Sequence, residues 1–171
     1  VAVADYDQDG DLDIFIVSED GNENISRLLQ NTNNGNFTDV TENSGINQNL
    51  NHEIDLINYD DNGEFSFDTI EHGDRLSASW GDFNNDGYPD LFLGNAVQSE
   101  LYKNNGNGTF SNITESAGFE ISCEKCYIAG ALWLDYDLDG YLDIFLSDYN
   151  QISPNKPVSY THLRAHETST Y

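Results

Sequence analysis

The sequence predicts an all-β chain that forms a partial, open β-propeller of about two to three four-stranded blades. An aspartate-rich nonapeptide occurs three times, and the residues around each copy have the pattern of short strands separated by turn signals. A second segment that follows the nonapeptide is also repeated. A fixed repeat of this size is typical of propellers and solenoids, and four strands per repeat make one propeller blade.

Each nonapeptide has oxygen-bearing side chains at positions 1, 3, 5 and 9 and glycine at position 6. The copies are residues 5–13 (DYDQDGDLD), 82–90 (DFNNDGYPD) and 135–143 (DYDLDGYLD). A small or apolar stretch precedes each copy, and a β-rich apolar run follows it. Each nonapeptide is therefore predicted to be a loop that joins two strands.

The spacing of the copies divides the chain into units. The nonapeptides start 77 and then 53 residues apart, and the segments 28–46 and 101–119 are identical at eight of nineteen positions. The base unit is therefore about 53 residues, and the first unit contains an insertion at about 47–70. The predicted divisions are a first repeat over 1–76, a second repeat over 77–128 and the start of a third over 129–157.

Two segments depart from this repeat. The insertion contains NYDDNG at 58–63, a partial copy of the loop. We interpret this segment as part of a hairpin, and a weak fourth metal site is the alternative. Residues 158–171 contain no Asp, Asn or Gly, the residues that dominate the repeats, and they resemble translated sequencing-adapter read-through. We therefore predict that this tail is non-native and exclude it from the predicted fold. Because the chain holds two units and the beginning of a third, the remaining blades are expected to be missing from it.

The charge excludes several classes of partner. The formal net charge is -25, from 31 acidic and 6 basic residues, so nucleic acid and anionic membrane surfaces would be repelled. The longest apolar run, Ile128–Leu134, has seven residues, which excludes membrane insertion through a helix. The composition, 37% hydrophobic and 12% aromatic, is that of a folded chain and not of a disordered acidic tail.

The nonapeptides are predicted to bind calcium. Clustered carboxylates repel one another unless a cation lies among them, and calcium takes six to eight oxygen ligands at about 2.3–2.6 Å. Positions 1, 3 and 5 are expected to point inward and position 4 outward, with positive φ at the glycine, a carbonyl ligand from position 7 and a closing ligand at position 9. Up to three Ca²⁺ ions are therefore expected. The candidate ligands are Asp5, Asp7, Asp9, Asp11, Asp13, Asp82, Asn84, Asp86, Tyr88, Asp90, Asp135, Asp137, Asp139, Tyr141 and Asp143.

The alternatives fit less well. An EF-hand needs glutamate at position 12 and flanking helices, whereas position 12 here is Ile16, Leu93 and Leu146. Magnesium prefers a stricter octahedron that retains several waters. Plain Asp-Gly turns would not require the same oxygen positions in three copies. On side-chain charge alone, which is -4, -3 and -4 for the three loops, the second site should be the weakest.

Other conspicuous residues have ordinary readings. Cys123 and Cys126 lack the further ligands of a zinc site and are interpreted as a local disulfide or two free thiols. His52 and His72 lie among acidic residues of the insertion, where a solvated loop is favoured over a catalytic pair. No catalytic residue is predicted, so the chain is not expected to be an enzyme. Two tryptophans that precede their loops, Trp80 and Trp133, are expected to pack between blades.

The nonapeptide with its apolar flanks resembles the FG-GAP/VCBS calcium-binding repeat of integrin-α-like propellers. Residues 104–118 (NNGNGTFSNITESAG) are similar to repeats of the cartilage acidic protein and ASPIC/UnbV group. The resemblance implies a fragment of a seven-bladed propeller that is secreted or surface-exposed. It also implies structural calcium in the loops and a binding surface built from inter-blade loops.

The expected function is therefore extracellular recognition or adhesion by a calcium-binding module. The location would be extracellular, cell-surface or periplasmic, and the partner an unknown protein or carbohydrate ligand. The alternative is a non-catalytic propeller domain appended to a secreted enzyme, such as a polysaccharide-degrading one.

Overall fold

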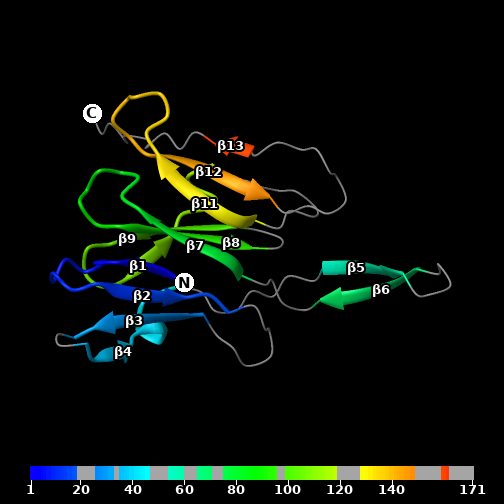
Figure 1. Ribbon diagram of the computed structural model, residues 1–171, viewed down its shortest axis with the longest axis horizontal. Coiled ribbons are helices and arrows are strands. Elements are labelled where there is room, and N and C mark those ends of the chain that lie inside the picture. Colours follow the sequence, from blue (N-terminus) through cyan, green and yellow to red (C-terminus); the bar gives the residue numbers. More distant parts are fainter. Residues whose placement is uncertain are drawn as a thin grey trace.

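The computed structural model describes residues 1–18, 26–32, 35–46, 54–59, 65–70, 75–95, 99–118, 128–148 and 159–161. These residues form three antiparallel sheets that follow one another along the chain, and a separate two-stranded sheet (Figure 1). A single 3-10 turn, η1 (Thr41–Asn43), is the one helical element among them. The prediction of an all-β, open propeller fragment is thus confirmed.

The first sheet has the order β1-β2-β3-β4 and the second β10-β9-β8-β7, so neighbours in sequence are neighbours in each sheet. The strands of these two sheets are β1 (Ala2–Ala4), β2 (Asp13–Ile16), β3 (Arg27–Asn31), β4 (Phe37–Asp39), β7 (Arg75–Gly81), β8 (Asp90–Asn95), β9 (Glu100–Asn104) and β10 (Phe110–Asn112). The third sheet contains β11 (Ile128–Leu134), β12 (Asp143–Asp148) and β13 (Ser159–Thr161).

The insertion of the first unit forms its own sheet of two antiparallel strands, β5 (Ile54–Tyr59) and β6 (Phe65–Ile70). Figure 1 places this hairpin to one side of the three stacked sheets. Residues 60–64, the centre of the partial loop copy, lie outside the described residues, as do Cys123, Cys126, His52 and His72. In the segment predicted to be non-native, β13 pairs with β12 and the rest is not described.

Each nonapeptide is the connection of an antiparallel hairpin, and the three connections are called loop 1 (residues 5–13), loop 2 (82–90) and loop 3 (135–143). The pairs that close the three hairpins are Ala4 with Asp13, Gly81 with Asp90, and Leu134 with Asp143. The aspartate at position 9 is therefore the first residue of β2, β8 and β12. The prediction that the acidic loop joins two strands is confirmed, and all three loops start from the same point of their sheets.

The threonine that recurs in the second repeated segment makes equivalent hydrogen bonds in the first and second sheets. The hydroxyl of Thr41 accepts a hydrogen bond from the Leu28 amide at 2.9 Å, and the hydroxyl of Thr114 accepts one from the Leu101 amide at 2.9 Å. Each hydroxyl also donates to the residue two positions earlier, Asp39 at 2.6 Å or Asn112 at 2.7 Å. These bonds satisfy backbone groups where the outermost strand of each sheet ends.

The sheets stack through their first strands, with β1 against β7 and β7 against β11. Two apolar clusters fill the spaces between neighbouring sheets. Between the first and second sheets lie Tyr6, Phe15, Leu28, Ile46, Leu91, Leu93, Tyr102 and Phe110. Between the second and third lie Phe83, Phe92, Leu101, Ile128, Ile144 and Leu146. The second sheet is covered on both faces, which is why all six residues of β8 are buried.

An aromatic contact recurs at both interfaces. Trp80 stacks on Tyr6 of loop 1 with ring centroids 6.3 Å apart and planes 16° apart. Trp133 stacks on Phe83 of loop 2 at 6.4 Å and 17°. Both ring partners stand at position 2 of their nonapeptide, and both tryptophans stand on the first strand of the next sheet. The expectation that these tryptophans pack between blades is confirmed.

The stack does not close on itself. Tyr136, the position-2 residue of loop 3, is 66% exposed, whereas Tyr6 and Phe83 are buried. Leu132 and Phe145 of the same sheet are exposed as well, and at the opposite end so are Val3 and Phe37 of the first sheet. No helix in the described part of the chain is long and apolar enough to cross a membrane.

Removing one stacked tryptophan tests the interfaces. We expect Trp80→Ala to lower the free energy of unfolding by about 3 kcal/mol, because the ring fills the space between two sheets. Leu132→Ala, at a side chain that is 60% exposed, should change it by less than about 0.5 kcal/mol. Urea unfolding followed by far-ultraviolet circular dichroism measures both. Equal losses for the two variants would contradict this account of the stack.

Candidate metal sites

The aspartate at position 9 anchors each loop to its sheet. Asp13 and Asp90 are fully buried, and Asp143 is 4% exposed. One carboxylate oxygen of each accepts the amide of position 2: Tyr6 at 3.1 Å, Phe83 at 3.2 Å and Tyr136 at 2.9 Å. These bonds draw the start of the loop back over its end, so that the chain wraps around a common centre.

The next strand supplies a second anchor in the first two sheets. The backbone amide of Asn31 in β3 donates to Asp13 at 2.8 Å, and that of Asn104 in β9 donates to Asp90 at 2.8 Å. These asparagines occupy equivalent positions of the repeat. Although they follow the position-9 aspartate by 18 and 14 residues respectively, both fix its carboxylate from a second side.

Backbone amides inside the loops hold the other acidic groups inward. The glycine at position 6 donates to the carboxylate at position 1, with distances of 3.1 Å in loop 1, 2.9 Å in loop 2 and 3.0 Å in loop 3. The amide of position 5 donates to the side chain at position 3 in every loop. The three glycines have φ of 96°, 92° and 91°, so the predicted positive φ at position 6 is confirmed.

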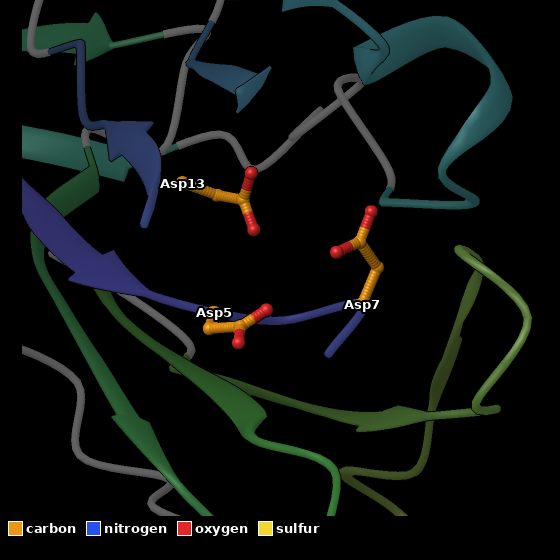
Figure 2. Close-up of side chains that lie close together, drawn as sticks. All are labelled: Asp5, Asp7 and Asp13. Atoms are coloured by element: carbon orange, nitrogen blue, oxygen red, sulfur yellow. The ribbon is translucent and has the colours of Figure 1, made fainter. Parts of the chain in front are cut away.

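In two of the three loops, three carboxylates of the same loop lie close together. Single oxygens of Asp5, Asp7 and Asp13 lie within 4.8 Å of one another, and those of Asp135, Asp137 and Asp143 do the same. Figure 2 shows the first group, with the three carboxylates turned toward one space. Two oxygens on opposite sides of a calcium ion would be about 4.6–5.2 Å apart, so these spacings are suitable for one ion.

One buried oxygen in loop 1 has no hydrogen-bond partner among the described residues. This atom is Oδ1 of Asp5. A buried carboxylate oxygen without a partner is costly, and a cation within the loop would remove that cost. The donor set, all carboxylate and carbonyl oxygen, is that of a hard cation such as calcium. The residues present therefore fit the group that the sequence predicts.

The position-5 aspartates differ from the position-9 aspartates in exposure and in hydrogen bonding. Asp9, Asp86 and Asp139 are exposed and do not belong to the two groups. Each instead accepts the backbone amide of position 7, at 2.9, 3.0 and 2.9 Å respectively. Their role as ligands, like that of the position-7 carbonyls of Asp11, Tyr88 and Tyr141, stays a prediction.

Loop 2 offers fewer negatively charged candidate ligands than the other two loops. Its position-3 residue is Asn84, whose amide oxygen accepts the Asp86 amide at 2.8 Å, while its buried Nδ2 has no acceptor among the described residues. Lys103 Nζ lies 3.8 Å from the Asp86 carboxylate. The equivalent residue of the first unit is Gln30, whose neutral amide donates to Asp7 at 2.5 Å. These contacts were not foreseen from the sequence.

Burial and mutual repulsion favour the uncharged form of two of the anchoring aspartates, Asp90 and Asp13. The pKa of Asp90 is raised to about 7 by burial and by the nearby Asp86 and Asp82, against the hydrogen bonds from Asn104 and Phe83, which lower it. Burial also raises the pKa of Asp13, for which Asn31 and Tyr6 supply the opposing bonds. These carboxylates therefore gain most from a compensating cation.

The fold and the loops together define a propeller-type repeat module. Residues 82–146 match the family model described as FG-GAP-like repeat, a stretch that runs from position 1 of loop 2 into β12. The match supports the predicted FG-GAP resemblance over that stretch. No curated protein matches the chain.

The raised pKa of Asp90 gives a pH dependence for the metal-free protein. The folded state retains a proton that the unfolded state releases above about pH 3.8, so the free energy of unfolding should fall as pH rises from about 4 to about 7. Urea unfolding in the presence of chelator across this range measures the slope. Asp90→Asn should flatten it, whereas an unchanged slope would show that another group is responsible.

Proposed function

We propose that this chain is a calcium-binding β-propeller repeat module whose loops hold up to three structural Ca²⁺ ions. The observation that carries the proposal is the convergence of positions 1, 3 and 9 in two loops, with one buried Asp5 oxygen left unpartnered. The same hairpin position and the same backbone bonds recur in all three loops.

The loop residues have distinct tasks in this proposal. Position 9 joins the sheet to the loop, and positions 1 and 3 present carboxylate or amide oxygen to the centre. Position 5 closes the exposed side, and the position-7 carbonyl completes the set. When bound, calcium would supply the positive charge that the ligands otherwise lack, and its binding free energy would add to the stability of the folded state.

We further propose that the module serves recognition or adhesion outside the cytoplasm and is not itself an enzyme. The FG-GAP-like match over 82–146 supports an extracellular, cell-surface or periplasmic location. Millimolar calcium, as found outside cells, suits loops of modest affinity. The net charge of -25 favours a neutral or basic protein or carbohydrate partner over nucleic acid. Membership of the VCBS or ASPIC/UnbV group is part of this proposal, supported by the nonapeptides with their apolar flanks for the former and by residues 104–118 for the latter.

Calcium should stabilise the protein measurably. At free calcium of about 100 times Kd, one site adds about 2.7 kcal/mol to the free energy of unfolding, and chelator should reverse the effect. Thermal unfolding with calcium or chelator measures this, and titration calorimetry gives affinity and number of sites.

The matched variants are Asp7→Asn and Glu115→Gln, which remove one charge inside and outside a loop. Asp7→Asn should weaken one site by at least about tenfold, the loss seen when even the outer partners of metal ligands are removed. Glu115→Gln, on an exposed turn, should leave every site unchanged. The metal claim fails if calcium changes neither the melting temperature nor the heat of titration.

A reciprocal exchange tests the weakness of loop 2. Lys103→Gln removes the cation beside Asp86, and we expect calcium affinity at loop 2 to rise by up to about fivefold. Gln30→Lys puts the same cation beside Asp7 and should weaken loop 1 by a similar factor. Titration calorimetry at low ionic strength measures both. An unchanged affinity in both variants would mean that this strand position does not influence the loops.

A further inference from the structure

Adjacent loops are joined by the side chain at position 4. Gln8 Nε2 of loop 1 donates a hydrogen bond to the carbonyl of Gly87 in loop 2. Asn85 Nδ2 of loop 2 donates to the carbonyl of Gly140 in loop 3 at 2.7 Å. Each acceptor is the position-6 glycine, whose carbonyl precedes the position-7 residue. The outward direction expected for position 4 is thus the direction of the next loop.

The backbone at position 4 is unusual in all three loops. Gln8, Asn85 and Leu138 have φ of 61°, 57° and 61°, in the left-handed region that side chains other than glycine rarely adopt. Leu138 has no side-chain amide group, and it is 85% exposed. The conformation therefore belongs to the loop itself, and the bond to the next loop depends on an amide side chain at this position.

A second connection between loops 1 and 2 runs through buried atoms. Asn104 Nδ2 donates to the Tyr6 carbonyl of loop 1 at 2.8 Å, while its backbone amide donates to Asp90 of loop 2 at 2.8 Å. The Tyr6 amide in turn donates to Asp13 at 3.1 Å. A continuous hydrogen-bonded path thus links the anchoring carboxylates Asp13 and Asp90.

We propose that Gln8 and Asn104 are positioning residues that couple the cation affinities of loops 1 and 2, with Gln8 as the adjustable part. The inference rests on the proposed calcium binding. Gln8 stands between Asp7 and Asp9, so fixing these two as ligands also fixes the amide against Gly87. Loop 2 then loses less conformational freedom when it binds, and its affinity rises. By linkage, filling loop 2 raises the affinity of loop 1 by the same factor.

Direct repulsion between two bound dications opposes this coupling, but loop 1 remains anionic when filled. The carboxylates at its positions 1, 3, 5 and 9 carry -4, and one Ca²⁺ leaves -2. Loop 2, with -3 and Lys103 beside it, is the loop whose filling depends most on its neighbour. The positive sign of the coupling therefore requires that the ordering through Gln8 and Asn104 outweigh this repulsion.

Glycine amides allow each loop to be followed separately. The amides of Gly10, Gly87 and Gly140 each donate to the position-1 carboxylate of their own loop. In a chain labelled with ¹⁵N-glycine, their nuclear magnetic resonance signals should shift as calcium is added and give one binding curve per loop.

The main variant is Gln8→Leu, which copies the residue found at position 4 of loop 3. We expect the calcium Kd read at Gly87 to increase about fivefold and the Kd read at Gly140, a loop that Gln8 does not contact, to change by less. Gln8→Asn, which copies loop 2, should keep most of the wild-type affinity. Leu138→Gln, at the exposed equivalent, is the control for changing position 4 and should leave Gly87 unaffected.

A second route tests the coupling with Gln8 in place. Asp5→Asn weakens loop 1 and should raise the Kd at Gly87 by the same factor as Gln8→Leu. The double variant should show no further loss, because both changes interrupt one path. Additive losses, or an unchanged Gly87 curve in either single variant, would overturn the coupling.

The two proposals fail differently. If none of the three glycines responds to calcium in the wild-type chain, calcium binding itself is wrong and the coupling falls with it. If all three respond and Gly87 is indifferent to loop 1, calcium binding stands and the coupling alone is wrong. Should Gln8→Leu not fold, judged by its calcium-free spectrum, the Asp5→Asn result decides.

Discussion

The buried aspartate that ends each nonapeptide is the constraint on which the rest of the architecture depends. Asp13, Asp90 and Asp143 lie at the first residue of a strand and accept the amide of position 2. A buried carboxylate is tolerated only when hydrogen bonds or charge compensate it. Its bonds therefore dictate where the loop begins and ends. The same burial that gives the hairpin its shape raises the pKa of Asp13 and Asp90, which makes the loop receptive to a cation.

The loop also determines how the sheets stack. Position 2 is held by the aspartate through its backbone, and its ring lies against the tryptophan of the next sheet, as Tyr6 does with Trp80. Gly81, beside that tryptophan, leaves room for the following one, since a Cβ there would lie 2.5 Å from Trp133 Cγ. Stability in such an array is a sum of unit and interface contributions. Here one residue belongs to both, so loosening a loop weakens the interface next to it.

Much of this could be predicted from the sequence because repetition exposes what each copy has in common. The hairpin positions of the loops, the positive φ at glycine and the packing of Trp80 and Trp133 all followed from aligned copies. What could not be predicted lies where copies differ or where two units meet. Gln8 and Asn85 carry amides whereas Leu138 does not, and nothing in the sequence shows that the amide of one loop reaches the next loop. Gln30 and Lys103 stand at equivalent positions of the repeat but differ in chemistry. Only the three-dimensional arrangement of the strands shows that both contact a loop carboxylate.

A large share of the negative charge of the chain lies in the row of adjacent loops. Of the 31 acidic residues, eleven supply side chains at positions 1, 3, 5 and 9, and the position-4 contacts place successive loops side by side. Repulsion in the metal-free state therefore acts between loops as well as within them, and it acts across the interfaces that the tryptophans hold together. Three dications would reduce the net charge only from -25 to -19, which is a small change for the whole molecule. Their effect would be local, because the charge they neutralise lies beside the contacts that join one sheet to the next.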